Sequence, residues 1–170
     1  ASQAVAVVAR VHDPDGLASL VLKYRVDPST NLTLVNMVNH GAGLFSGTIP
    51  GQPTGRLVAF HLQATDHHAP SASSLFPVDA RVRECLVRWG DTAQGGHFGT
   101  YRLWLTLATL NRWSQREKLS NKPLDATFVY GSQRIVYNTG AQYAGSPWHS
   151  PGYDTPTGNV CDYVLNFPED

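Results

Sequence analysis

The chain has 170 residues, and its 13 Lys and Arg balance its 13 Asp and Glu, which gives a formal net charge of zero. Balanced charge argues against nucleic acid as a partner, because neutralising a phosphate backbone needs a concentrated basic surface. Hydrophobic residues make up 42% of the chain and charged residues 15%, as is typical of a globular protein. No apolar run approaches the roughly 18 residues of a transmembrane helix, so we expect no membrane insertion.

Short runs rich in β-branched and aromatic residues follow one another through the first half of the chain. Between them lie turn segments such as 13–16 (DPDG), in which Pro presets φ and Gly accepts a positive φ. We predict strands over residues 4–11, 20–26, 32–38, 44–49, 57–64, 75–83 and 85–88. This spacing is typical of an immunoglobulin-like or fibronectin-III-like β-sandwich, which we predict for residues 1–88.

The composition changes after this region. Residues 89–98 are polar and Gly-rich, as expected of a linker. The sequence predicts a small α+β unit over residues 99–170. Together with the sandwich, this makes the predicted fold of the whole chain mainly β. Its predicted elements are a strand over 101–105, a helix over 107–119 with Thr106 as N-cap, a hairpin of 127–130 and 133–137 with a two-residue turn, and strands over 141–144 and 161–167. A unit of about 70 residues is marginal alone, so we expect it to depend on the sandwich or on downstream sequence.

Several runs in the second half resemble the opening section of bacterial CotH-type proteins. They are 99–106 (GTYRLWLT), 108–113 (ATLNRW), 124–131 (LDATFVYG) and 161–170 (CDYVLNFPED). That family is named for a spore-coat protein and contains atypical secreted protein kinases, and many bacterial members carry the CotH region beside Ig-like modules. The resemblance implies that the chain is a fragment of an extracellular or cell-surface protein that continues downstream.

The resemblance also implies where catalytic residues would be. A CotH kinase needs a nucleotide-anchoring Lys in its N-lobe and a later Asp/Asn pair for metal binding and phosphoryl transfer. The chain ends before that later region, and no Lys follows Lys122. We therefore carry over no catalytic residue, cofactor or metal to this chain, and ATP and a divalent metal would belong to the parent protein. Two functions follow: a non-catalytic scaffold or adhesion fragment, and an N-lobe portion whose catalytic residues lie downstream.

A long loop offers a third function. Residues 146–158 are rich in Pro, Gly and Ser, and loops of this length without secondary structure often carry function. Trp148, His149, Tyr153 and Asp154 lie in this loop and are the candidate ligand-binding residues. They would make the chain a carbohydrate- or peptide-binding module, with a protein or a cell-surface glycan as partner.

The two cysteines allow two interpretations. In the oxidising compartment that the family resemblance implies, a bridge between Cys85 and Cys161 would join the two halves of the chain. The alternative is two buried thiols of the ordinary apolar kind.

Histidine and carboxylate side chains fall in turns that we expect at one end of the sandwich, because consecutive antiparallel strands alternate in direction. These residues are His12, Asp13, Asp15, His40, Asp66, His67 and His68. Such side chains could ligate Zn²⁺ or Ca²⁺, but no metal-motif spacing is present, and turn residues of this kind also bond their own backbone. We assign no metal to them.

Overall fold

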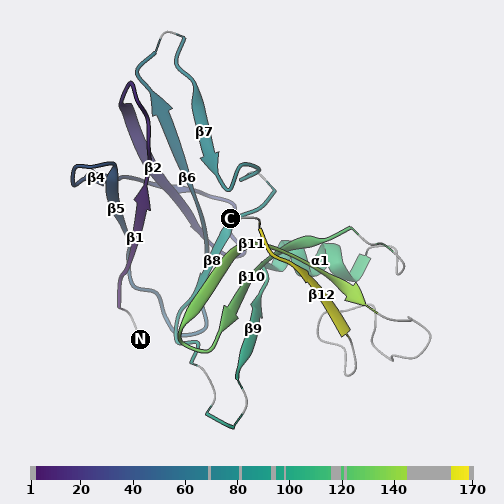
Figure 1. The fold of residues 1–170 in the computed structure, drawn as a ribbon. Helices are drawn as coiled ribbons and strands as arrows, with labels where there is room; N and C mark the ends of the chain where they lie inside the picture. The colour runs from purple at the N-terminus through teal and green to yellow at the C-terminus, as the bar shows by residue number, and fades with distance from the viewer. Residues whose placement is uncertain are drawn as a thin grey trace. The chain divides into compact units, whose positions relative to one another are not determined.

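The computed structural model describes residues 3–168 except residues 69, 81, 93–94, 98, 116–119, 121 and 145–161. The protein is mainly β, as the sequence predicts (Figure 1). It divides into two compact units, Ala1–Asp91 and Thr92–Asp170, and this division falls within residues 89–98. Trp89 lies in the first unit, where its backbone N–H donates to the carbonyl of Arg56 (2.9 Å) and its indole N–H donates to the carbonyl of Gln3 (2.8 Å).

The first unit contains two antiparallel sheets. The smaller sheet has the strand order β1-β5-β4, with β1 (Val5–Arg10), β5 (Leu44–Ile49) and β4 (Val38–Asn39). The larger sheet has the order β3-β2-β6-β7, with β3 (Thr33–Asn36), β2 (Leu17–Val26), β6 (Leu57–Asp66) and β7 (Ser73–Phe76), and β8 (Cys85–Arg88) also pairs with β6. The immunoglobulin-like assignment stays a prediction at this point.

An apolar core lies between the two sheets. Leu22 of β2 pairs with Leu62 of β6, and all of the Leu22 side chain is buried. Gly47 of β5 faces Leu22, because a Cβ atom there would lie 3.2 Å from the side chains of both Leu22 and Met37. The small residue therefore allows β5 to approach β2 closely, and the alternation of apolar residues along β2 accounts for the burial of one face of the larger sheet.

Two predicted strands are wrong in their extent. Residues 75–83 do not form one strand, because β7 ends at Phe76 and Pro77 has no N–H for a ladder. A turn follows, in which the carbonyl of Pro77 accepts from Ala80 (3.0 Å). Residues 32–38 contain β3 and β4, which belong to different sheets. The two separate at Met37, whose N–H donates to Leu20 of the larger sheet (2.9 Å).

The second unit is one antiparallel sheet with a helix. The sheet has the order β12-β11-β10-β9, with β12 (Asp162–Asn166), β11 (Arg134–Ala144), β10 (Leu124–Tyr130) and β9 (Tyr101–Trp104). Helix α1 (Leu107–Gln115) packs on one face of this sheet through Trp113, which is fully buried against Ala126 and Ala141. The helical period places Trp113 on this face, and the strand period places Ala126 there.

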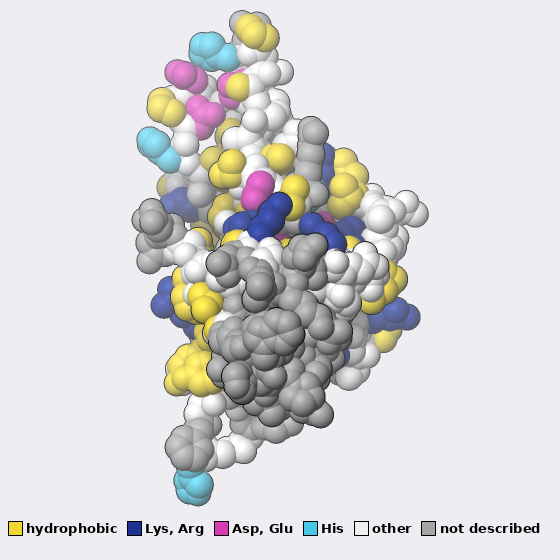
Figure 2. Space-filling model, turned by 90° about the vertical axis from the view of Figure 1, so that its right-hand side faces the viewer, with side chains coloured by type: hydrophobic (Ala, Val, Ile, Leu, Met, Phe, Trp, Pro, Cys, Tyr) yellow, Lys and Arg dark blue, Asp and Glu magenta, His cyan; other side chains and the backbone are white. Residues whose placement is uncertain are grey.

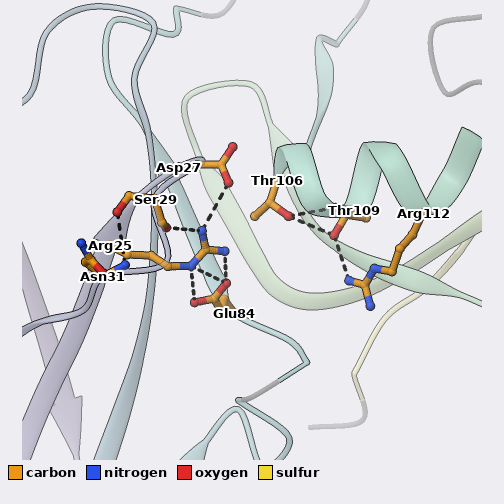
Figure 3. A network of polar contacts seen from close by, with 8 residues as sticks. All are labelled: Arg25, Asp27, Ser29, Asn31, Glu84, Thr106, Thr109 and Arg112. Carbon is orange, nitrogen blue, oxygen red and sulfur yellow. Dashed lines mark hydrogen bonds and ion pairs between the residues drawn. The ribbon is translucent and has the colours of Figure 1, made fainter.

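The predicted start of the helix is confirmed. The Thr106 hydroxyl accepts from the Thr109 backbone N–H (3.1 Å), as expected of an N-cap (Figure 3). Residues 116–119 of the predicted helix lie outside the described residues. Among the described residues, no helix is long and apolar enough to cross a membrane.

The hairpin is present, but two details differ from prediction. The ladder closes at Tyr130 and Arg134, which leaves a three-residue connection in place of the predicted two. Residues 141–144 are the end of β11 and not a separate strand. The strand continues past Asn138, which has a φ of 57° and lies where the register with β10 shifts. This irregularity absorbs the extra residue without ending the strand.

Candidate functional site

Part of the predicted site lies outside the described residues. This applies to the loop residues Trp148, His149, Tyr153 and Asp154, and to Cys161. Cys85 is buried on β8. Ligand binding by the loop and the bridge between the cysteines therefore stay predictions.

The turns that carry the His and Asp residues lie side by side at one end of the first unit. Leu17 pairs with Asp66, which places the β1–β2 turn next to the β6–β7 turn. The Val11 N–H donates to the carbonyl of Gly43 (2.9 Å), which attaches the β4–β5 turn to the same end. Acidic and histidine side chains gather over these turns at the top of Figure 2. The alternation of strand direction therefore indicates correctly which turns meet.

These polar side chains bond their own turns. The Asp13 carboxylate accepts from the backbone N–H of Asp15 (3.0 Å), and the Asp66 carboxylate accepts from those of His68 (3.2 Å) and Ala72 (2.9 Å). Across the described ranges, no group of three or more His, Cys, Asp or Glu is placed to hold a metal ion. The geometry therefore gives these carboxylates a local structural role.

A second polar cluster lies on the larger sheet around Arg25. The Arg25 guanidinium pairs with both carboxylate oxygens of Glu84 and donates to the carbonyl of Ser29 (2.9 Å), with Asp27 at 3.4 Å (Figure 3). The hydrogen bond to Glu84 is the main reason that the pKa of Arg25 lies above its ordinary value, although burial acts in the opposite direction. Arg25, Glu84 and Asp27 therefore form a cluster of ion pairs that stabilises the fold.

His61 lies on the neighbouring strand and is buried. It pairs with Lys23 in the sheet register, and its Nδ1 atom has no hydrogen-bond partner among the described residues. Burial lowers the pKa of His61 below its ordinary value, and the charge of Lys23 lowers it further, while the charge of Glu84 opposes both. His61 is therefore neutral at pH 7.

The second unit presents a cluster of aromatic side chains, which we call the aromatic patch. It contains the exposed Tyr101, Tyr130 and Phe167 and the half-buried Phe128. Tyr101 of β9 pairs with Tyr130 of β10, and their rings are stacked with centroids 5.1 Å apart and planes inclined by 20°. Phe128 also stacks on Tyr101 (5.8 Å) and meets the edge of Phe167 (5.3 Å). The patch is therefore a continuous set of four rings from three segments of the chain.

Much of the aromatic patch is exposed to solvent, and the backbone at Gly99 packs against one of its rings. Tyr101 is 65% exposed and Phe167 is 52% exposed, which is high for side chains of this size. A Cβ atom on Gly99 would lie 2.8 Å from the Tyr130 ring, so the absence of a side chain at Gly99 allows that ring to pack on the backbone. Contiguous exposed apolar surface of this kind typically marks an interaction site.

The aromatic patch was not predicted from the sequence. Phe128 and Tyr130 alternate along a predicted strand, which indicates that they share a face. The pairing of β9 with β10 places Tyr101 beside them. Phe167 follows β12, at the opposite edge of the sheet from β9, and its ring contacts Phe128. Pairings between distant segments cannot be derived from the spacing of residues along one strand.

A scan against protein-family models, a search of curated proteins and a search of solved structures found no match to the chain.

Proposed function

We propose that this chain is a non-catalytic scaffold and adhesion region of a secreted or cell-surface bacterial protein of the CotH type, and that its aromatic patch contacts a cell-surface glycan. In this proposal the first unit is an immunoglobulin-like spacer. Its strand orders support that assignment: β1-β5-β4 corresponds to the B-E-D order of such sandwiches, and β3-β2-β6 corresponds to C′-C-F, with β7 and β8 both paired with β6 where strand G would lie.

The observation that carries the proposal is the stacked pair of Tyr101 and Tyr130 on adjacent strands. The apolar C–H face of a pyranose ring packs against aromatic rings, while its hydroxyl groups remain available to water and to phenolic oxygens. The stacked rings of Tyr101 and Tyr130 cover part of each other's faces, and the remaining exposed surface, largest at Tyr101 (65% exposed), lies beside two phenol groups. A sugar ring could therefore pack on the exposed part of Tyr101 and bond to the phenol groups beside it.

The other polar clusters support a structural role for the remaining surface. Arg25 and Glu84 connect strands of the larger sheet, and the Asp13 and Asp66 carboxylates bond their own turns. These charged groups therefore stabilise the fold of the described residues. A scaffold with one exposed aromatic surface accounts for this distribution.

The proposal is tested by co-sedimentation of the whole chain with three insoluble polysaccharides: cellulose, chitin and peptidoglycan. We expect binding to at least one of them, and a loss of about tenfold in affinity when Tyr101 and Tyr130 are both replaced by Ser, given about 0.5–1.5 kcal/mol for each aromatic contact. Ile135→Ser is the matched control, because Ile135 is also exposed but lies on β11 opposite Val129, on the other face of the sheet.

Two outcomes would contradict the proposal. One is equal binding by the double variant and the parent chain, which would remove the aromatic patch from the interaction. The other is tight binding of Mg·ATP by this chain, measured by calorimetry, which would favour the N-lobe of a kinase instead.

A further inference from the structure

One row of side chains across the sheet of the second unit contains the stacked tyrosines and a cation. Tyr130 of β10 lies opposite Tyr101 of β9 on one side and opposite Arg134 of β11 on the other. Residues that lie directly opposite each other in antiparallel strands have their side chains on the same face, with Cβ atoms about 5 Å apart. Arg134 is therefore the next side chain in the row that holds the two tyrosines.

The Arg134 side chain is exposed, and it has no ion pair or hydrogen bond with any residue of the described chain. Arg102 of β9 differs in both respects. It lies opposite Val129, on the other face of the sheet, and its guanidinium donates to the carbonyl of Gly131. Arg102 therefore stabilises the hairpin, whereas the charge of Arg134 is available to a ligand.

The acidic residues of the second unit that the structure describes lie away from this row. Asp125 is buried, and Asp162 lies at the other end of β11 from Arg134. Glu169 and Asp170 lie outside the described residues. Within the described part of the unit, the charge beside the two tyrosines is therefore positive.

An exposed guanidinium beside aromatic rings is suited to an acidic sugar. The rings offer an apolar surface to the C–H face of the sugar, and the guanidinium fork binds both oxygens of a carboxylate together. Tyr101 and Arg134 lie on strands separated by β10, so their backbones are about 10 Å apart, which is two interstrand spacings. A short oligosaccharide that packs on Tyr101 therefore extends across Tyr130 toward the cation.

We propose that Arg134 selects an acidic glycan at the aromatic patch: a sugar packs on the tyrosines, and the carboxylate of a uronic acid unit binds the Arg134 guanidinium. This inference rests on the proposed function, because the patch supplies the apolar contact. It adds the substrate class, which is a glycan that contains uronic acid in preference to a neutral glycan of the same linkage.

The experiment compares two soluble hexasaccharides, cellohexaose and the β-1,4-linked hexamer of glucuronic acid, by calorimetry with the whole chain at neutral pH. The two sugars differ at C6, where the acid has a carboxylate in place of a hydroxymethyl group. We expect the acidic hexamer to bind about tenfold more tightly, because hydrogen bonds between charged groups are stronger than those between neutral groups.

Variants of Arg134 show whether this side chain causes the preference. Arg134→Gln should make the two hexamers bind equally, and Arg134→Lys should retain part of the preference, because Lys keeps the charge but not the fork. Lys122→Gln is the matched control. It removes one positive charge from the same unit, before the start of β10 and so at the opposite end of that strand from Tyr130, and it should keep the full preference.

The outcomes distinguish this inference from the proposed function. If the parent chain binds both hexamers equally, and the double Ser variant of Tyr101 and Tyr130 binds neither, the aromatic patch binds glycans and the inference alone is overturned. If the double Ser variant keeps an Arg134-dependent preference, or if the parent chain binds neither hexamer at millimolar concentration, both proposals are overturned.

Two further results would overturn the inference alone. One is a loss of preference in Lys122→Gln equal to that in Arg134→Gln, which would assign the effect to the net charge of the unit. The other is tighter binding of a sulfated cellohexaose than of the glucuronic acid hexamer, which would exclude a carboxylate as the preferred group.

Discussion

Arg25 of β2 and Glu84 form a two-pronged ion pair that spans a strand of the larger sheet. The Arg25 Nε atom lies 3.0 and 3.1 Å from the two carboxylate oxygens of Glu84. Glu84 immediately precedes β8, and β6 lies between β2 and β8, with Ala59 opposite Arg25. The side chains of the pair are 12% and 16% exposed, so the pair is mostly removed from water.

Replacing Glu84 by Gln should lower the free energy of unfolding by about 3 kcal/mol, because the mostly buried Arg25 charge loses its main counter-ion. Urea denaturation measures this loss. Asp79→Asn is the matched control, since the Asp79–Arg83 pair is more exposed, and exposed pairs contribute only about 0.5 kcal/mol. Equal losses in the two variants would show that burial does not strengthen the Arg25 pair.

Acid should destabilise the first unit through His61. Burial holds the pKa of His61 below its unfolded value of about 6.5, so the unfolded state binds more protons between the two pKa values. Stability is therefore fully present above about pH 6.5 and decreases as the pH falls through the window below it. The measurement is the unfolding free energy as a function of pH.

Substituting His61 by Gln should flatten this part of the pH profile, because Gln does not titrate. His40→Gln is the control, since His40 is exposed in the β4–β5 turn region. A profile that keeps its slope in His61→Gln would assign the pH dependence to other groups.

Thr106 should stabilise the start of α1. Its hydroxyl accepts from the Thr109 N–H at 3.1 Å, so Thr106→Ala should cost about 1 kcal/mol. Amide hydrogen exchange at Thr109 should become faster, whereas Thr106→Ser should retain slow exchange because Ser caps as well. Unchanged exchange in the Ala variant would mean that the cap contributes nothing to the helix.

Gly99 should control the geometry of the aromatic patch. Gly99→Ala places a Cβ atom 2.8 Å from the Tyr130 ring and should move the ring away from Tyr101. The expected results are altered ring-proton shifts of both tyrosines and severalfold weaker polysaccharide binding. Gly95→Ala is the control, because a Cβ atom there meets nothing within 4 Å.

Local rules predicted many of the elements. Strand propensity, turn residues and the Thr106 cap act within a few residues, so they can be read from neighbouring positions. The errors arose where distant segments decide the structure. The run 32–38 divides because β3 and β4 join different sheets, and Tyr101 becomes part of a surface only through its pairing with Tyr130.

The candidate residues show the same difference. The alternation of strand direction correctly grouped the turns of Asp13 and Asp66, because direction follows from strand order alone. Their side-chain bonds to local backbone depend on turn geometry that the order does not specify. The predicted loop residues around Trp148 lie outside the described residues and remain a separate hypothesis.

An NMR titration of the whole chain with cellohexaose and chitohexaose shows whether the aromatic patch binds a glycan. We expect the amide and ring signals of Tyr101, Phe128, Tyr130 and Phe167 to shift together, and the signals of β1 and α1 to remain in place. Shifts centred on other elements, or none at millimolar concentrations of either sugar, would contradict glycan binding by the patch.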